Sequence, residues 1–347
     1  MMSVRVAIIG AGIMGRDHAR IIAEELPGAH LQVVCDAREN RARSVADALG
    51  ASDVATDAMA TITRSDVDAV LIASPDDTHA PLAIAAIAAS KPTLCEKPLA
   101  PTSQECLEVI AAELQAGLRL IQTGFMRRFD QSYMAMKAAF DEGTLGKAVM
   151  MHNFHRNMAA PDWFTGQMAI SNSAPHEFDI CRFVLGTEYV SMTAFQGQKT
   201  KSIAPVMMVL ETVDGQLVNI EINNNAAYGY DVRGELVGER GSVSLSTPVH
   251  ASYDLALHST HSYDADWRPR FAEAYRRQNR AWLNSIVTEH PDSSAANAWD
   301  GYCATRVAEA GMASLKAGAR VDIARAEMPA LYAHEGQKTE SLRGKEI

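Results

Sequence analysis

Residues 4–15 of this chain are Val4-Arg5-Val6-Ala7-Ile8-Ile9-Gly10-Ala11-Gly12-Ile13-Met14-Gly15. The mostly apolar run is typical of a buried parallel strand, and the pattern that follows, up to residue 25, is helical. Glycine at positions 10, 12 and 15 gives GxGxxG between strand and helix. The first glycine permits a tight turn, the second lets the backbone approach a pyrophosphate, and the third lets the helix pack on the strand. With the amides of Ile13 and Met14 facing the anion, this stretch predicts a doubly wound parallel sheet that binds a dinucleotide.

The residue that ends the next apolar run favours NAD over NADP. Residues 31–35 form a second predicted strand, which ends at Asp36. An acidic residue about 20 positions after the last glycine binds the two hydroxyls of an adenosine ribose and repels a 2′-phosphate. An aspartate that only forms a turn is the alternative. Arg38 leaves NADP open, since an arginine at this place could bind the extra phosphate.

A lysine followed by a proline ends another predicted strand, in Leu94-Cys95-Glu96-Lys97-Pro98. Proline disfavours helical geometry in the residue before it, so Lys97 should leave the strand extended. The strand predicted at residues 69–73 runs into Ser74 and, a few residues later, His79. Open α/β sheets bind ligands at the carboxyl ends of their strands, so we expect Ser74, His79, Glu96 and Lys97 to line the cofactor site. For an isolated Lys-Pro, a surface lysine beside a turn would be the better interpretation.

Length and composition indicate a globular protein of two domains that binds small molecules. The 347 residues are 47% hydrophobic and 21% charged, with a formal net charge of −10. An acidic balance argues against a nucleic-acid surface, which needs clustered Lys and Arg. No apolar run approaches the roughly 20 residues that span a bilayer. The five cysteines are scattered and form no CxxC pair, which suggests reduced thiols, a cytoplasmic location and no metal site.

The alternation of strands and helices changes after residue 123. From Gly146 onward, residues 147–155, 189–195, 206–212, 217–223, 231–237 and 242–245 have the patterns of strands. We predict a large, mostly antiparallel open sheet, one face of which packs on helices while the other covers a ligand or meets another subunit. The predicted units are an NAD-binding domain (residues 1–123), an α/β domain for substrate binding and oligomerisation (124–330), and a polar tail (331–347).

One predicted helix of the second half carries a histidine near its start. Apolar residues at 178, 181, 184 and 185 mark a helical stripe, and Gly186 is a suitable end. Asn172 or Ser173 can be the N-cap, with Pro175 in the first turn. The helix dipole then disfavours a charged imidazole at His176, and we expect a neutral histidine that can accept a proton. A partly buried packing histidine is the alternative interpretation.

Several motifs together resemble the Gfo/Idh/MocA oxidoreductases and, within them, the inositol 2-dehydrogenases. The motifs span nearly the whole chain up to about residue 323. They are residues 9–18, Cys95-Glu96-Lys97-Pro98, Gly124-Phe125-Met126-Arg127-Arg128-Phe129-Asp130, His155-Arg156-Asn157, His176-Glu177-Phe178-Asp179, Tyr228-Gly229-Tyr230-Asp231 and Ala298-Trp299-Asp300-Gly301-Tyr302.

The resemblance implies NAD-dependent oxidation of a secondary alcohol on a cyclitol or sugar, by an enzyme that is commonly a tetramer. It places the catalytic lysine at Lys97 and the catalytic histidine at His176. The residues that meet substrate hydroxyls in similar enzymes fall on Arg127, His155, Asn157 and Tyr230. On this basis His176 takes the hydroxyl proton while Lys97 binds the carbinol oxygen, or Lys97 itself is the base.

One position departs from the family pattern. Four residues before the histidine these dehydrogenases usually carry an aspartate, and here the residue is Asn172. An amide can accept a hydrogen bond but adds no charge to stabilise an imidazolium. The sequence therefore leaves three functions open: an inositol dehydrogenase, an aldose or keto-sugar dehydrogenase or reductase, and a dinucleotide-binding sensor without chemistry.

Overall fold

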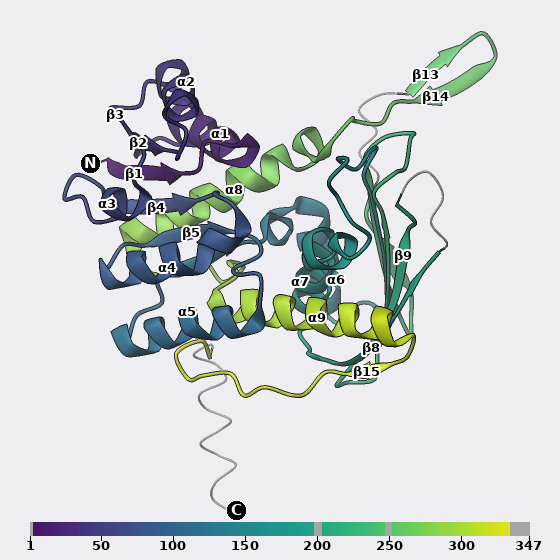
Figure 1. Cartoon of the computed structure of the whole chain (residues 1–347). Helices are drawn as coiled ribbons and strands as arrows, with labels where there is room; N and C mark the ends of the chain where they lie inside the picture. The colour runs from purple at the N-terminus through teal and green to yellow at the C-terminus, as the bar shows by residue number, and fades with distance from the viewer. Residues whose placement is uncertain (1–2, 198–202, 247–251, 334–347) are drawn as a thin grey trace, which may run out of the picture.

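Two large β-sheets and the helices packed on them form the body of the described structure, and a third, two-stranded sheet lies apart from them (Figure 1). The structure is a computed structural model that describes residues 3–197, 203–246 and 252–333. Within these ranges, no helix is both long enough and apolar enough to cross a membrane.

The first sheet has six parallel strands in the order β3-β2-β1-β4-β5-β6. Its strands are β1 (Val4–Ile9), β2 (Ala29–Cys35), β3 (Asp53–Ala55), β4 (Ala69–Ile72), β5 (Thr93–Glu96) and β6 (Ile121–Gly124). From β1, the chain first adds β2 and β3 on one side of the sheet and then β4, β5 and β6 on the other. The point where the order changes direction opens the crevice typical of dinucleotide-binding sheets. The predicted doubly wound parallel sheet is thus confirmed, although its three-residue strand β3 was not predicted.

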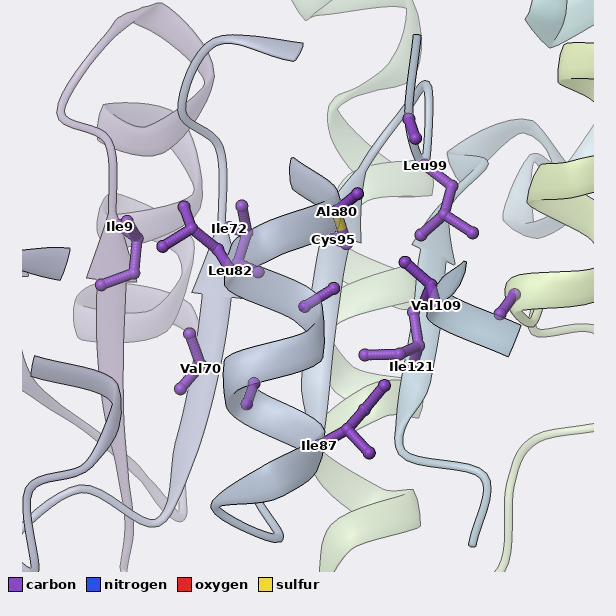
Figure 2. Close-up of a cluster of buried hydrophobic side chains, with 14 of the residues drawn as sticks. Ile9, Val70, Ile72, Ala80, Leu82, Ile87, Cys95, Leu99, Val109 and Ile121 are labelled. Atoms are coloured by element: carbon purple, nitrogen blue, oxygen red, sulfur yellow. The ribbon is translucent and has the colours of Figure 1, made fainter. Parts of the chain in front are cut away.

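Helices cover both faces of this sheet. Those between its strands are α1 (Ile13–Arg20), the π-helical turn η1 (Ile21–Glu25), α2 (Glu39–Leu49), α3 (Ala58–Ile62), the 3-10 turn η2 (Asp76–Thr78), α4 (His79–Ala88) and α5 (Ser103–Ala116). One face packs on α4 and α5, and Figure 2 shows Ile72 of β4 beside Leu82 of α4, and Ile87 of α4 toward Ile121 of β6, in this core. The start of α9 (Ala298–Ala317) adds Trp299 to the same core.

The opposite face of the first sheet is completed by a helix from the second half of the chain. α8 (Trp267–Thr288) places Phe271, Tyr275 and Trp282 in one core with Val6 and Ile8 of β1. Neither α8 nor α9 was predicted from the sequence. Each half of the molecule is therefore tied to the other by shared hydrophobic cores.

The second sheet has seven strands in the order β12-β11-β7-β10-β9-β8-β15 and is mostly antiparallel, as predicted. Only β7 and β10 pair in parallel. Its strands are β7 (Ala148–Arg156), β8 (Tyr189–Gln196), β9 (Val206–Thr212), β10 (Leu217–Asn223), β11 (Asp231–Gly238), β12 (Ser242–Ser244) and β15 (Val321–Asp322). β13 (Ser252–Leu255) and β14 (His258–His261) form a separate hairpin that projects from the body (Figure 1).

One face of the second sheet packs on helices. The remaining elements of this half are the 3-10 turn η3 (Met126–Phe129), α6 (Gln131–Asp141), the π-helical turn η4 (Ala169–Ser173) and α7 (Pro175–Leu185). α6, α7 and α9 lie on the inner side of the sheet (Figure 1) and share its core. The outer side carries exposed apolar residues, among them Phe195, Met207, Val209 and Leu217.

Two details of the predicted elements are corrected. Neither Asn172 nor Ser173 caps α7, because the chain is already helical in η4 before α7 begins, and Ala174 stands at the N-cap without a side-chain hydrogen bond. The predicted tail also begins too early. Tyr332 is buried and its hydroxyl donates to Oε2 of Glu113 at 2.6 Å, while residues 334–347 lie outside the described ranges.

Candidate active site

The glycine loop between β1 and α1 has the geometry that a dinucleotide requires. Gly10 has φ +98°, which L side chains rarely adopt, and a Cβ on Gly15 would lie 1.7 Å from the Gly10 carbonyl oxygen. A Cβ on Gly12 would meet nothing within 4 Å, so open space lies beside the start of α1. No side chain caps that helix, so its first amides are available to a pyrophosphate.

Asp36 at the end of β2 is fastened to this loop. Its Oδ2 accepts a hydrogen bond from the backbone N–H of Ala11 at 2.8 Å, and its Oδ1 accepts one from the N–H of Arg38 at 2.9 Å. The carboxylate is thereby fixed beside the glycine turn, where an adenosine ribose would lie. The side chain of Arg38 is exposed.

His79 lies under the cofactor edge of the sheet and is bonded on both sides of its ring. Nδ1 lies 2.7 Å from the carbonyl oxygen of Pro98, and Nε2 lies 2.9 Å from that of Ser74. Carbonyl oxygens only accept, so both ring nitrogens donate and the ring carries a proton on each. Burial alone would lower the pKa of His79, but Cys95 and the Pro98 carbonyl raise it to about 10. The ring thus joins the loop after β4 to the residue that follows Lys97.

Glu96, directly before Lys97, forms a buried link to α1 and α8. Its Oε1 accepts from Nε2 of His18 at 2.8 Å, and Nδ1 of His18 accepts from the Asn279 amide at 2.9 Å. The other oxygen of Glu96 accepts the backbone N–H of Lys97 at 3.1 Å. His18 is fully buried and Asn279 equally so. Three elements far apart in sequence therefore fix the backbone at Lys97.

Lys97 reaches the start of the helix that carries His176. Its Nζ donates to the carbonyl oxygen of Asn172 at 3.1 Å. His176 lies in the first turn of α7, is 8% exposed, and packs edge-on against the Phe125 ring. Burial, with Lys97 and Arg127 nearby, holds the pKa of His176 well below its ordinary value, so the ring is neutral and can accept a proton.

The Asn172 side chain bonds to a residue of the first half of the chain. Its Nδ2 donates to Oδ2 of Asp76, in η2 of the first half, at 3.4 Å. Nδ1 of His176 is buried and has no hydrogen-bond partner among the described residues. Among the residues that the structure describes, no carboxylate is hydrogen-bonded to the His176 ring.

A buried group of charged and polar residues lies behind His176. Arg127 is 1% exposed and forms an ion pair with Glu177, whose other oxygen accepts from Nδ1 of His155 at 3.2 Å. Burial alone would raise the pKa of Glu177, but Arg127 and His155 hold it below its ordinary value. With the hydrogen on Nδ1, the Nε2 atom of His155 is the acceptor, 3.5 Å from Nδ2 of Asn157.

Asn157 and Tyr230 lie beside His155, and we call these three residues the wall of the site. Nδ2 of Asn157 also donates to Oδ1 of Asn224 at 2.6 Å. The Tyr230 ring stands edge-on to His155, with ring centroids 5.9 Å apart, and burial raises the pKa of its hydroxyl to about 12. The wall therefore offers imidazole, amide and phenol groups, which suit a ligand rich in hydroxyls.

Comparison with known proteins decides the family. Residues 4–125 match the model of the oxidoreductase family with an NAD-binding Rossmann fold, and residues 133–244 match that of the GFO/IDH/MocA C-terminal domain. The chain belongs to the GFO/IDH/MocA family. The resemblance predicted from the sequence is thereby confirmed, and so are the dehydrogenase class and NAD as cofactor.

Relatives within the GFO/IDH/MocA family match the chain over nearly its full length. Inositol 2-dehydrogenase 1 of Saccharopolyspora erythraea is 44% identical over 337 residues, which cover 95% of this chain and 99% of that protein. Inositol 2-dehydrogenase of Streptomyces avermitilis is 38% identical, with 94% and 96% covered. The crystal structure of myo-inositol dehydrogenase from Lactobacillus casei in complex with NAD(H) and myo-inositol superposes with a TM-score of 0.90 at 28% identity, covering 96% and 100%.

The site contains residues that were not predicted. His18 lies within the GFO/IDH/MocA fingerprint region but was given no role, and Glu177 follows His176 directly. A charged residue next to a histidine on a largely buried helix is the signal that could have identified Glu177. Asp76 and Asn224 gave no such signal, because their contacts come from segments far away in the chain.

Proposed function

We propose that this protein oxidises a secondary alcohol of a cyclitol, converting an inositol to the keto-inositol with transfer of hydride to NAD. The observation that carries the proposal is the contact between Nζ of Lys97 and the Asn172 carbonyl at 3.1 Å, one helical turn before the neutral His176. This contact brings the Lys97 amine, at the cofactor edge of the first sheet, to the segment that leads into His176, the proton acceptor in the second half of the chain. The relatives' names supply the substrate class.

The proposed roles follow from what alcohol oxidation requires. His176 takes the hydroxyl proton, and Lys97 donates a hydrogen bond to the carbinol oxygen as negative charge develops there. NAD, when bound, accepts the hydride. Asn172 contributes its backbone carbonyl, which orients the Lys97 amine.

The cofactor site in this proposal combines fixed backbone with few side chains. Gly10, Gly12, Gly15 and the amides of Ile13 and Met14 receive the pyrophosphate, and Asp36 receives the ribose, with Arg38 at its edge. The Ser74 hydroxyl, which is hydrogen-bonded to Thr78 at 2.6 Å, lines the nicotinamide side. His79 and Glu96 are buried and engaged within the protein, so we propose that they position this edge without touching NAD.

The substrate wall is proposed to be His155, Asn157 and Tyr230, whose polar atoms suit the hydroxyls of a ring polyol. Arg127 was predicted to contact substrate directly. Because its guanidinium is buried against Glu177, we propose that it acts by fixing Glu177 and, through it, His155.

A substrate panel tests the proposal. Absorbance at 340 nm reports the formation of NADH or NADPH from myo-inositol, scyllo-inositol and glucose with NAD and NADP side by side. With the keto forms it reports the consumption of NADH or NADPH. Fastest turnover of an inositol with NAD is the expected result. Preference for glucose or for reduction of a keto form would favour the sugar enzyme, and NAD binding without turnover on any polyol would favour the sensor.

We further propose that the protein is a homo-oligomer, a tetramer or dimer, and works in the cytoplasm. Phe195, Met207, Val209 and Leu217 are 39–58% exposed on the outer side of the second sheet, and exposed apolar residues gathered on one face are typical of an interface. All five cysteines are free and buried, which suits a reducing compartment.

A further inference from the structure

The proton acceptor His176 has cationic neighbours. Lys97 and Arg127 both stand close enough to lower the pKa of His176, so protonation of His176 in alcohol oxidation adds a cation to an already positive site. Such a site gains from a nearby carboxylate, because an opposite charge within about 4–6 Å favours the charged form of a base.

The carboxylates closest in sequence to the two reactive residues are already paired. Glu96 is bonded to His18, and Glu177 is paired with Arg127 and His155. Asp76 differs from both. Among the described residues no lysine or arginine forms an ion pair with it, and its side chain accepts from the Asn172 amide.

Asn172 bridges Asp76 and Lys97 through two different groups. Its backbone carbonyl accepts from Nζ of Lys97 at 3.1 Å, and its side-chain amide donates to Oδ2 of Asp76 at 3.4 Å. Asp76 and Asn172 are both half-buried, so the charge is screened less than on an open surface. Asp76 also contributes to the raised pKa of His79, at the start of α4.

We propose that Asp76 is a positioning residue of the oxidation site, which holds the Asn172 amide and supplies, from the loop after β4, the negative charge that position 172 does not carry. The inference rests on the proposed function for its kinetic part only. It also explains why asparagine suits position 172. An aspartate there would bring two carboxylates into contact, and one of them would be forced to hold a proton.

Kinetics of Asp76→Asn, Asn172→Asp and the double variant test the charge, with Asp77→Asn as the matched control because Asp77 is exposed on the same turn. We expect Asp76→Asn to lower kcat for oxidation on the order of tenfold and to move the acidic limb of the pH profile to lower pH, because the base becomes weaker. Asn172→Asp alone should also lower kcat, whereas the double variant, with one carboxylate again, should recover most of it. Asp76→Glu should retain more activity than Asp76→Asn. If Asp76→Asn matches Asp77→Asn, or if Asn172→Asp raises kcat while Asp76 is intact, the proposal is overturned.

The contact itself is tested without turnover. In urea unfolding, Asp76→Ala and Asn172→Ala should each lower the urea concentration at the midpoint, and the two decreases should not add in the double variant. The decreases caused by Asp77→Ala and Asn172→Ala should add. Additive losses for the first pair overturn the inference. If the wild type turns over no polyol or sugar, the proposed function fails, and this cycle still decides whether Asp76 and Asn172 are coupled.

Discussion

Nε2 of His18 lies 2.8 Å from Oε1 of Glu96, and this buried hydrogen bond joins the first helix of the glycine loop to the strand that ends at Lys97. The placement of Lys97 therefore depends on a residue of the cofactor loop's own helix. A change at His18 should affect both stability and the site.

We expect His18→Ala to lower the free energy of unfolding by about 1–3 kcal/mol, because Glu96 and Asn279 lose their partner in the core. The affinity for NAD should fall as well, since α1 and β5 are no longer fixed to each other. Urea unfolding and NAD titration by fluorescence measure the two effects. His30→Ala, at an exposed histidine, serves as the control, and equal losses in both variants would contradict the assigned role of His18.

Replacement of Lys97 by alanine should abolish NADH formation and leave NAD binding largely intact. The Asn172 carbonyl holds the amine at the site, and groups that stabilise developing charge contribute on the order of a hundredfold or more to the rate. Stopped-flow absorbance at 340 nm and NAD titration separate the two quantities. Normal turnover in the variant would refute the catalytic assignment.

The raised pKa of His79 predicts how the stability of the folded protein depends on pH. Its pKa is about 10 in the folded protein against an ordinary value of 6.5, so the folded state binds the proton more tightly than the unfolded state does. This contribution is fully present below pH 6.5 and is lost as the pH rises toward 10, by up to about 1.4 kcal/mol per pH unit. The difference in unfolding free energy between wild type and His79→Gln should therefore shrink from pH 6 to pH 9.5. A difference that stays constant over this range would show that His79 is not protonated in the fold.

The outer side of the second sheet should control assembly. Val209 is 39% exposed there beside Met207, and an aspartate at its position would place a charge in the apolar centre of an interface. We expect Val209→Asp to convert an oligomer to a smaller species in light scattering after size exclusion. Val287→Asp, at a comparably apolar exposed position on α8, should leave the mass unchanged.

Local patterns predicted the fold well where the chemistry is local. The glycine loop, the strand that ends at Lys97 and the strands of the second sheet could be found because apolar periodicity and glycine spacing are properties of neighbouring residues. β3 was missed because three residues are too few for a periodic signal. The N-cap of α7 was misplaced because η4 already supplies a helical turn, which a capping pattern does not reveal.

Contacts between segments far apart in the chain could not be predicted from the sequence. That Asn172 meets Asp76 depends on how the two sheets are placed relative to each other, and that Arg127 is buried against Glu177 depends on how η3 packs on α7. Charge and residue type indicated that these residues matter. Only the packed structure shows which side chain each of them uses, and for what.

The position of α8 has a consequence for how the protein is made. Phe271, Tyr275 and Trp282 close the core over β1, yet a ribosome synthesises β1 first and α8 more than 250 residues later. Until α8 emerges, the face of the nascent sheet that holds Val6 and Ile8 lacks this cover. The cofactor half can therefore complete its core only near the end of translation, and a chain released before α8 would expose an apolar surface that chaperones bind.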